Sequence, residues 1–580
     1  MIDTPTNNFC TLNPLTNREI PTLNGNLEWE NTGQGGNNWQ GIQGTMALPS
    51  SGKWYFEFLQ YQESGSGTSW GNLYAGCGVI DNGTIQDGTQ NVWSGMWGVS
   101  DKGWGINNSG NSGMSYISAL DVGPPTVYSI AVDMDNNTMK VAANGSAYST
   151  LNFTLPSGGT YTPGIITHPN SKIGFNAGQD SSFAGRKSGS TNASDGNGKG
   201  DFYYTPPSGH LALCTNNLPA PTVKPKDNFN VILYAGNTSV DRDVTGVGFQ
   251  PDFTWIHVRT ANYDNQLYDA VRGGGKELRS DSTMAEIDRP NKLNSFLPDG
   301  FTLGDGTNQG VEVNQNGQTY VAWNWKANGT GSSNTSGTIN TTATSANTTA
   351  GFSIITYTGN GSNNQTLGHG LSAAPEFIMC KKRGASTEHW ATYRNDGGTA
   401  KRMYLNLQNA EGTAGSVWPT VATSSLITIG TAGDVNDNNG TYVMWCWHSV
   451  DGYSKIGSYI GNGTNGNGPF VYTGFRPAWV MIKNTDNGSD NWNFADRARL
   501  QAQGAQDRPD FNSGANYTKH SLSANLALGE SHFGGATSNK IDFLSNGFKP
   551  MDAGTWGNTN THEYFYIAFA EFPFKYTNAR

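Results

Sequence analysis

The chain of 580 residues repeats itself three times in its C-terminal part. Each unit closes with an aromatic run: Tyr320–Trp325, Tyr442–Trp447 and Tyr564–Phe569. The tyrosines that begin these runs stand 122 residues apart. This period is too long for one rung of a solenoid, because such rungs span roughly 20–50 residues. The spacing therefore predicts three tandem domains, each large enough to bury a core of its own.

Other segments recur inside each unit in the same order. Each unit opens with a β-like run, and a Gly…Pro turn then leads into an apolar strand. The opening runs are 229–237, 352–361 and 453–463, and the turns with their strands are 248–256, 370–379 and 474–482. Strand-forming residues between turn signals, without helical periodicity, predict an all-β chain. We expect β repeat 1 at 229–326, β repeat 2 at 352–452, and β repeat 3 at 453–580 with an insertion between Leu500 and Asn525.

The rest of the chain divides by composition. Residues 27–180 alternate short β-like runs with Gly/Asn turns, which predicts a β-sandwich. Residues 1–26 indicate an extended N-terminal arm, 181–228 a loop followed by a Pro-rich linker, and 327–351 a Ser/Thr/Asn/Gly linker. The 76 glycines, the 14% of charged residues and the 11% of aromatic residues fit a turn-rich β protein. They exclude a helical bundle, a coiled coil and an acidic disordered chain.

Charge and cysteine content exclude further classes. The net charge is −10 and no basic stripe is present, so we expect no nucleic acid as partner. The longest apolar run, near 566–574, is too short for membrane insertion. Five scattered cysteines predict neither disulfides nor a zinc site, and we expect no metal and no cofactor. The first 25 residues have no apolar core, so we expect no signal peptide, although the composition is typical of extracellular proteins.

Catalytic motifs are weak. Arg272–Glu277 is similar to a phosphate loop, but Glu277 stands where that loop needs Ser or Thr, and a structural turn explains the glycines. The nine histidines show no metal-binding spacing. Glycan hydrolysis by two carboxylates about 5–10 Å apart stays open as an alternative, although most acidic residues lie in turns. We therefore expect no enzymatic activity.

Aromatic residues give the stronger indication of function. Sugar rings stack on Trp and Tyr, while Asn, Asp and Gln bond the hydroxyl groups. Several tryptophans lie among Gly and Asn rather than in apolar runs, and core packing is the competing explanation for each. The candidate ligand contacts among them are Trp70, Trp93, Trp97, Trp104, Trp418, Trp492 and Trp556.

The first domain resembles the SPRY (B30.2) family. The matching segments are Gly52–Glu57, Gly76–Val79, Tyr128–Asn136, Tyr161–Pro163 and Ile173–Asn176. The resemblance covers about residues 27–180 and implies a SPRY- or concanavalin-like sandwich whose loops bind partners without catalysis. The segment from Met96 to Leu120 departs from the family, so contacts of the family's loops do not transfer to it.

The remaining segments resemble tail proteins of marine tailed bacteriophages. The matches are Asn8–Leu15, Asn24–Leu27, Asp451–Lys455, Phe475–Val480 and Phe572–Arg580. This resemblance implies a virion protein, assembled in the host cytoplasm and released by lysis, which also agrees with the lack of an export signal. It assigns neither a catalytic residue nor a receptor.

Together these features predict a tail fibre or receptor-binding adhesin. Its expected partners are a host cell-surface glycan or protein and other tail proteins of the virion. We expect a homo-oligomer, a homotrimer by analogy with fibres in general, whose weak contacts add up through avidity. The alternatives are a capsid-decorating structural protein without a receptor and a glycan depolymerase tailspike.

Overall fold

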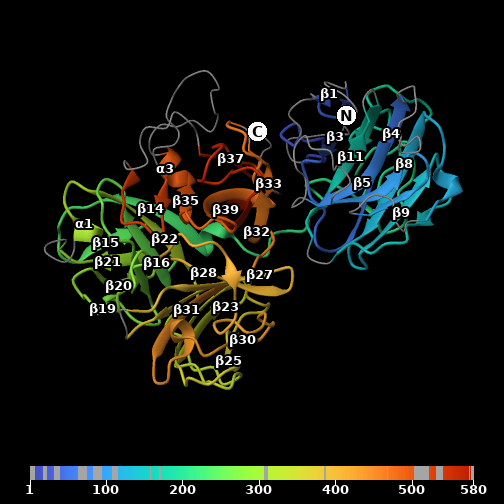
Figure 1. Ribbon diagram of the computed structural model, residues 1–580. Coiled ribbons are helices and arrows are strands. Elements are labelled where there is room, and N and C mark those ends of the chain that lie inside the picture. Colours follow the sequence, from blue (N-terminus) through green and yellow to red (C-terminus); the bar gives the residue numbers. More distant parts are fainter. Residues whose placement is uncertain are drawn as a thin grey trace. The chain divides into compact units, whose positions relative to one another are not determined.

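A computed structural model of the chain shows its architecture (Figure 1). It describes residues 7–16, 22–31, 40–62, 75–81, 95–107, 115–156, 159–168, 171–305, 311–384, 387–466, 468–501, 521–530, 540–573 and 575. Contacts divide the chain into two compact units. Unit 1 comprises Met1–Ala220, Pro469–Gly474 and Phe574–Ala579, and unit 2 comprises Pro221–Gly468 and Phe475–Pro573.

The prediction of an all-β chain is confirmed. Helices among the described residues are limited to single turns. These are η1 (Ser118–Leu120), η2 (Pro225–Asp227), α1 (Val311–Asn314), α2 (Gly433–Asn436) and α3 (Arg497–Gln501). Every other regular element is a strand, as the frequent aromatic residues and glycine turns favour.

Unit 1 is a sandwich of two sheets around one core. The first sheet runs β1 (Thr22–Leu23), β2 (Glu28–Glu30), β12 (Lys172–Asn176), β4 (Lys53–Gln62), β8 (Thr126–Asp133), β9 (Thr138–Ala143), β10 (Ser149–Thr150), with β13 (Leu211–Ala212) also pairing β4. The second runs β3 (Gln40–Gln43), β11 (Tyr161–Thr167), β5 (Ala75–Asp81), β6 (Met96–Ser100), β7 (Gly105–Asn107). Trp54, Phe56 and Phe58 alternate along β4 and point into the core between the sheets.

The outer face of β4 is also covered, which corrects two predictions. Tyr55 packs with Phe9 and Phe202, and Leu59 packs with Phe183. The predicted N-terminal arm 1–26 and the first part of the predicted loop 181–228 are therefore parts of the unit 1 fold. Their buried aromatic rings hide an apolar sheet face that would otherwise be in water. The composition of these two segments predicted an arm and a loop because their few aromatic residues are scattered among many Gly, Ser and Asn residues.

Unit 2 contains three sheets with one strand order. They are β14 (Phe229–Ala235), β22 (Thr319–Trp325), β16 (Phe253–Val258), β17 (Gln266–Asp269); then β24 (Phe352–Thr358), β31 (Thr441–Trp447), β26 (Phe377–Lys382), β27 (Ala391–Asp396); and β32 (Ser454–Ile460), β39 (Glu563–Pro573), β34 (Phe475–Asn484), β35 (Asn493–Asp496). Added strands at sheet edges are β23 (Ala343–Asn347), β28 (Thr399–Tyr404), β29 (Gly412–Thr413) and β36 (Leu522–Ser523). All pairings in these three sheets are antiparallel.

Smaller strands accompany each of these sheets. They are β15 (Arg242–Thr245), β18 (Lys276–Glu277), β19 (Ile287–Asp288), β20 (Leu293–Leu297), β21 (Gly300–Leu303), β25 (Gln365–Gly368), β30 (Leu426–Ile429), β37 (Ile541–Leu544) and β38 (Gly547–Pro550). The remaining strand, β33 (Val471–Tyr472), belongs to the Pro469–Gly474 part of unit 1.

The repeating tyrosines play the same part in each sheet. Each stacks on a tyrosine of the neighbouring strand, and the ring centroids lie 5.1 Å apart for Tyr234–Tyr320 and Tyr357–Tyr442 and 5.3 Å apart for Tyr459–Tyr564. The hydroxyl oxygens of Tyr320, Tyr442 and Tyr564 each accept a hydrogen bond from a backbone N–H five residues earlier. These side chains therefore brace the turn before each aromatic strand.

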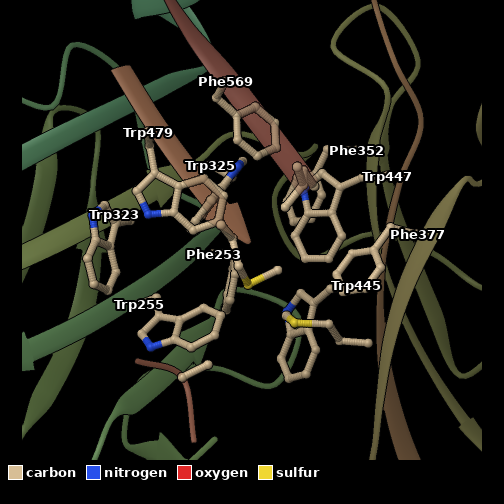
Figure 2. Packing of buried hydrophobic residues seen from close by; sticks show 14 of the residues in the cluster. Phe253, Trp255, Trp323, Trp325, Phe352, Phe377, Trp445, Trp447, Trp479 and Phe569 are labelled. Carbon is tan, nitrogen blue, oxygen red and sulfur yellow. The ribbon is translucent and has the colours of Figure 1, made fainter. Parts of the chain in front are cut away.

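A single aromatic core joins the three sheets (Figure 2). Trp325 from the first sheet lies 6.2 Å from Trp447 of the second and 5.7 Å from Trp479 of the third, between ring centroids. Phe253 also contacts both Trp325 and Trp445. The first and second repeats each also bury a cluster of their own, around Phe301 and around Tyr357 respectively. The expectation of separate cores is therefore confirmed for these two repeats, and the core shared by the three sheets comes in addition. The residue limits predicted for the repeats stay a prediction.

Hydrogen bonds also link each repeat to another. Trp390 donates its indole N–H to the carbonyl of Arg279 at 2.9 Å, and Trp492 donates to the carbonyl of Tyr404 at 3.0 Å. Asn265 donates its side-chain amide to the carbonyl of Ser523 at 3.1 Å. The second repeat is thus bonded to the first, the third to the second and the first to the third, which closes a ring of contacts.

The predicted linker 327–351 is wrong as well. Its residues Ala343–Asn347 form β23, which pairs with β24 in antiparallel register. Thr341 and Ser345 are buried, and the backbone N–H of Asn328 donates to Ser345 Oγ at 2.8 Å. A Thr- and Ser-rich segment can serve as an edge strand because its hydroxyl groups satisfy neighbouring backbone groups. Most of the predicted insertion, residues 502–520, lies outside the described residues.

Candidate ligand-binding site

The structure divides the candidate tryptophans into three groups. Trp70 and Trp93 lie outside the described residues. Trp418, Trp492 and Trp556 are 1%, 0% and 6% exposed, and each donates its indole N–H to a partner inside the protein. These three predictions are wrong, because glycine-rich surroundings in sequence do not prevent a ring from packing in the interior. Trp97 and Trp104 remain as candidates.

Trp104 forms an exposed aromatic pair with Tyr116. Trp104 is 37% exposed and Tyr116 is 47% exposed. Their ring centroids lie 5.4 Å apart, and the ring planes meet at 50°. We call these two side chains the aromatic pair. Trp97 lies on β6, seven residues before Trp104, and is partly buried. The centroid of its ring lies 5.2 Å from that of Phe153.

A tight backbone frame positions the aromatic pair. Trp104 and Tyr116 form an antiparallel bridge, flanked by hydrogen bonds from Gly105 N to Ser115 O at 3.3 Å and from Ile117 N to Gly103 O at 2.9 Å. Gly103 has a φ of +70°, and a Cβ there would lie 2.4 Å from the carbonyl oxygen of Ile117. Only glycine allows this close approach, so the local sequence determines where the two rings emerge.

Hydrogen bonds further restrain both aromatic residues. Trp104 N donates to Ser100 Oγ at 3.1 Å, and Ser100 N donates to the carbonyl of Trp104 at 2.8 Å. The Tyr116 hydroxyl donates to Asp121 Oδ2 at 2.8 Å, and this bond raises the pKa of Tyr116 above its ordinary value. The carboxylate therefore orients the phenol. The result is a pre-arranged apolar surface with a carboxylate beside it.

Sequence reasoning missed Tyr116 and Asp121. Both lie in the segment Met96–Leu120 or directly after it, where the resemblance to SPRY domains could not be transferred. The sequence does contain a pattern that could have revealed Tyr116: Trp104 is followed by a run rich in Gly, Asn and Ser, and Tyr116 follows that run. That pattern indicates two strands joined by a long turn, which brings the flanking aromatic residues side by side.

Buried carboxylates elsewhere have structural partners. Glu57 accepts hydrogen bonds from Tyr55 Oη, Asn176 Nδ2, Tyr203 N and Tyr204 N at 2.8–3.0 Å. Burial nevertheless raises the pKa of Glu57 to about 7. The carboxyl group of Glu57 therefore joins residues 203–204 to β4 through hydrogen bonds.

One carboxyl pair in unit 2 bears on the alternative of glycan hydrolysis. Burial first, and then the charge of Asp264, raise the pKa of Asp281 to about 8, and the two side chains are hydrogen-bonded to each other. Asp264 is also paired with Arg279. Carboxyl groups in direct contact leave no room between them for a glycosidic bond, which needs a separation of about 5–10 Å.

Two further surveys cover only the described part of the chain. Within it, no group of three or more His, Cys, Asp or Glu side chains is arranged to hold a metal ion. The helices described there are also too short to cross a membrane.

Comparisons with known proteins place the C-terminal part of the chain in a family. The sequence model of a family described as a domain of unknown function (DUF7483) matches residues 224–573, more than half of the chain. No curated protein matches the chain. The matched range lies within unit 2, except that it also includes Pro469–Gly474, which belong to unit 1.

Three solved structures are similar to the chain, each with a TM-score of 0.23. The SPRY domain of human HERC1 is 16% identical and aligns with 28% of this chain and 96% of its own. The PSpry domain of TRIM65 is 13% identical over 29% of this chain and 92% of its own. Stonustoxin is 18% identical over 29% of this chain and 27% of its own. The first two are domains of the family that the motifs between Gly52 and Asn176 resemble.

Proposed function

Because the chain belongs to the DUF7483 family, whose function is unknown, we propose a function from the geometry: a non-enzymatic adhesin of a tailed-phage virion. The protein acts as a tail fibre or receptor-binding protein and contacts the host cell through loops of the unit 1 sandwich. The observation that carries this proposal is the aromatic pair. Rings of this size are normally buried, and those left exposed on a rigid frame favour a binding role.

The build of unit 2 suits a supporting part of such a fibre. Its three sheets share one aromatic core and its repeats close a ring of hydrogen bonds, so the unit resists deformation as a whole. Its large buried side chains include Trp255, Trp323, Trp390 and Trp445. In this proposal unit 1 provides the contact and unit 2 provides a rigid body.

Weak single contacts are sufficient if several copies act together. By analogy with fibres in general, we propose that the protein is a homo-oligomer, namely a trimer. Linked sites raise the overall avidity by roughly 10²–10⁴ over one site when the geometry lets them bind together. One exposed aromatic pair per subunit can then hold a particle to a cell.

Competition for adsorption tests this function. Purified full-length protein, added to host cells before phage, is expected to reduce the rate of adsorption in proportion to its concentration. The Trp104→Ala variant is expected to compete at least about tenfold less well, because it removes half of the aromatic pair. Undiminished adsorption at saturating wild-type protein would contradict the proposal. Labelling the protein on particles for electron microscopy locates it at the tail or, in the contrary case, on the capsid.

A further inference from the structure

We propose that the aromatic pair binds an uncharged oligosaccharide rather than an acidic polysaccharide or a protein. This inference rests on the proposed function, and it adds the chemical class of the ligand. Three features of unit 1 carry it: the angle between the two rings, the polar groups beside them, and the charges of the surrounding segment.

The ring geometry fits consecutive sugar units. Each pyranose presents a face of C–H groups that packs on an aromatic ring, as apolar groups pack on the negative face of a π system. The planes of Trp104 and Tyr116 meet at 50° with centroids 5.4 Å apart. One flat ligand cannot cover both rings at that angle. Two linked sugar rings can, because neighbouring units of a glycan chain are rotated relative to each other.

Polar groups beside the rings match sugar hydroxyls. Asp121 is exposed and accepts a hydrogen bond from the Tyr116 hydroxyl with Oδ2, and a carboxylate has a second oxygen that can accept from a sugar hydroxyl. Asn152 is exposed, and its Oδ1 accepts the backbone N–H of Ser115 at 3.4 Å, so its NH₂ group can serve as a donor. A carboxylate acceptor and an amide donor beside a stacking surface are the usual complement of a hydroxyl-bearing ring.

The charges disfavour an acidic ligand. Residues 95–122 contain three ionisable acidic or basic side chains, namely Asp101, Lys102 and Asp121. Asp101 is 2% exposed, Lys102 is partly buried, and Asp121 is exposed next to Tyr116. The chain as a whole carries a net charge of −10. A polymer of uronic or sulfated sugars would therefore meet a carboxylate at the stacking surface and repulsion at long range.

The extent of exposed apolar surface disfavours a protein partner. Among the described residues of unit 1, the large hydrophobic side chains that are exposed are Leu15, Leu23, Trp104 and Tyr116. A stable protein interface needs about 600–1,000 Å² on each partner with an apolar centre. Two rings edged by Asp121 and Asn152 are closer in size to a disaccharide.

A binding assay on the full-length protein tests the ligand class. Immobilised neutral saccharides and acidic saccharides of bacterial envelopes are probed with labelled protein, and hits are measured by calorimetry at about 50 and 500 mM NaCl. We expect hits among neutral saccharides, with a Kd that changes less than about twofold between the two salt concentrations, because no charge on the ligand is screened.

Variants attribute any binding to the aromatic pair. Trp104→Ala is expected to weaken binding at least about tenfold, and Tyr116→Phe is expected to retain the stacking and lose less than Tyr116→Ala. Phe572→Ala removes a 42% exposed ring of unit 2 and is the matched control, expected to bind as the wild type does. Melting temperatures close to that of the wild type show that the variants fold, as expected for side chains more than a third exposed.

The outcomes separate this inference from the proposed function. Binding to acidic saccharides only, binding to no saccharide, or unchanged binding by Trp104→Ala would each overturn the ligand class. Such a result together with blocked phage adsorption would leave the adhesin function in place with another ligand. Binding to neutral saccharides without any block of adsorption would instead overturn the adhesin function and keep the ligand class.

Discussion

Unit 1 and unit 2 use the same residue types in opposite ways. In unit 1, Trp104 and Tyr116 lie at the surface on a glycine-shaped frame. In unit 2, Trp418 and Trp492, which stand in equally polar stretches of sequence, are buried. The difference teaches that a tryptophan among Gly and Asn indicates a binding residue only where no second layer of the fold covers it.

The units also differ in how they bury charge. In unit 2, the pairs Arg272–Asp269, Arg499–Asp496 and Lys292–Glu277 have fully buried side chains. In unit 1, Glu57 is buried with hydrogen-bond donors and without a cation in contact among the described residues. These pairs of unit 2 are therefore sensitive to loss of the partner charge, whereas Glu57 of unit 1 is sensitive to pH.

The largest effect is expected from opening the shared core of unit 2. Trp325→Ala removes a 1% exposed ring that contacts aromatic residues of all three sheets, and it should cost about 3–5 kcal/mol of unfolding free energy. Because the core is shared, hydrogen exchange should accelerate in β22, β31 and β39 together while peptides of unit 1 keep their rates. Acceleration confined to the first sheet would contradict a common core.

A slightly smaller loss is expected from breaking a buried ion pair. Asp496→Asn removes one carboxylate from the buried Arg499, which keeps its contact with Glu530, and it should cost about 3 kcal/mol. The control is Asp288→Asn in the exposed pair with Lys276, where about 0–1 kcal/mol is expected. Denaturant unfolding of both variants measures the contrast. Equal losses would show that burial does not determine the strength of these pairs.

The pH dependence of unit 1 is expected to follow Glu57. Its pKa is raised by burial from its ordinary value of 4.5 to about 7, so the folded state holds the proton more tightly than the unfolded state. The resulting stabilisation is complete below about pH 4.5 and is lost as the pH rises through about 7. Hydrogen exchange of β4 peptides at pH 5 and pH 8, corrected for intrinsic rates, should show lower protection at pH 8.

The Glu57→Gln variant separates this group from others. Its amide cannot ionise, so the difference in β4 protection between pH 5 and pH 8 should shrink. An amide also offers one acceptor oxygen to four donors, so protection should be lower than in the wild type at pH 5. A variant with the full pH dependence of the wild type would assign the effect to another group.

The smallest change in stability is expected at the aromatic pair. Trp104→Ala should lower the free energy of unfolding by about 1 kcal/mol, because the ring is 37% exposed and its contact with Tyr116 is lost. Trp492→Ala in unit 2 is the matched comparison, with about 3–5 kcal/mol expected. Thermal unfolding of both variants sharpens the contrast between the two units. A large loss in Trp104→Ala would mean that this ring stabilises the fold instead of serving a ligand.

Period-two alternation and turn signals were sufficient to predict the fold class, since both depend on local sequence. They could not show what a strand face packs against. Trp323 and Trp325 would alternate in the same way in a separate core or a shared one, so the joint core of unit 2 went unpredicted. The packing of Phe9 and Phe202 on β4 was missed for the same reason, because single rings in polar segments leave no periodic pattern.

The candidate site was predicted in part. Trp104 was found because exposed tryptophans often lie among turn residues, but the same rule selected Trp418, Trp492 and Trp556, which are buried. Tyr116 and Asp121 depend on the backbone pairing of Trp104 with Tyr116 and on one hydrogen bond. Such contacts are tertiary, so composition and spacing could not reveal them.

Adsorption by phage that carry altered protein tests the central proposal most directly. Particles with Trp104→Ala and Tyr116→Ala together, checked for normal content of the protein, are compared with wild-type particles on the same host cells. If the aromatic pair contacts the host, the variant particles should adsorb with a rate constant at least about tenfold lower than that of wild-type particles. An unchanged rate constant would contradict it.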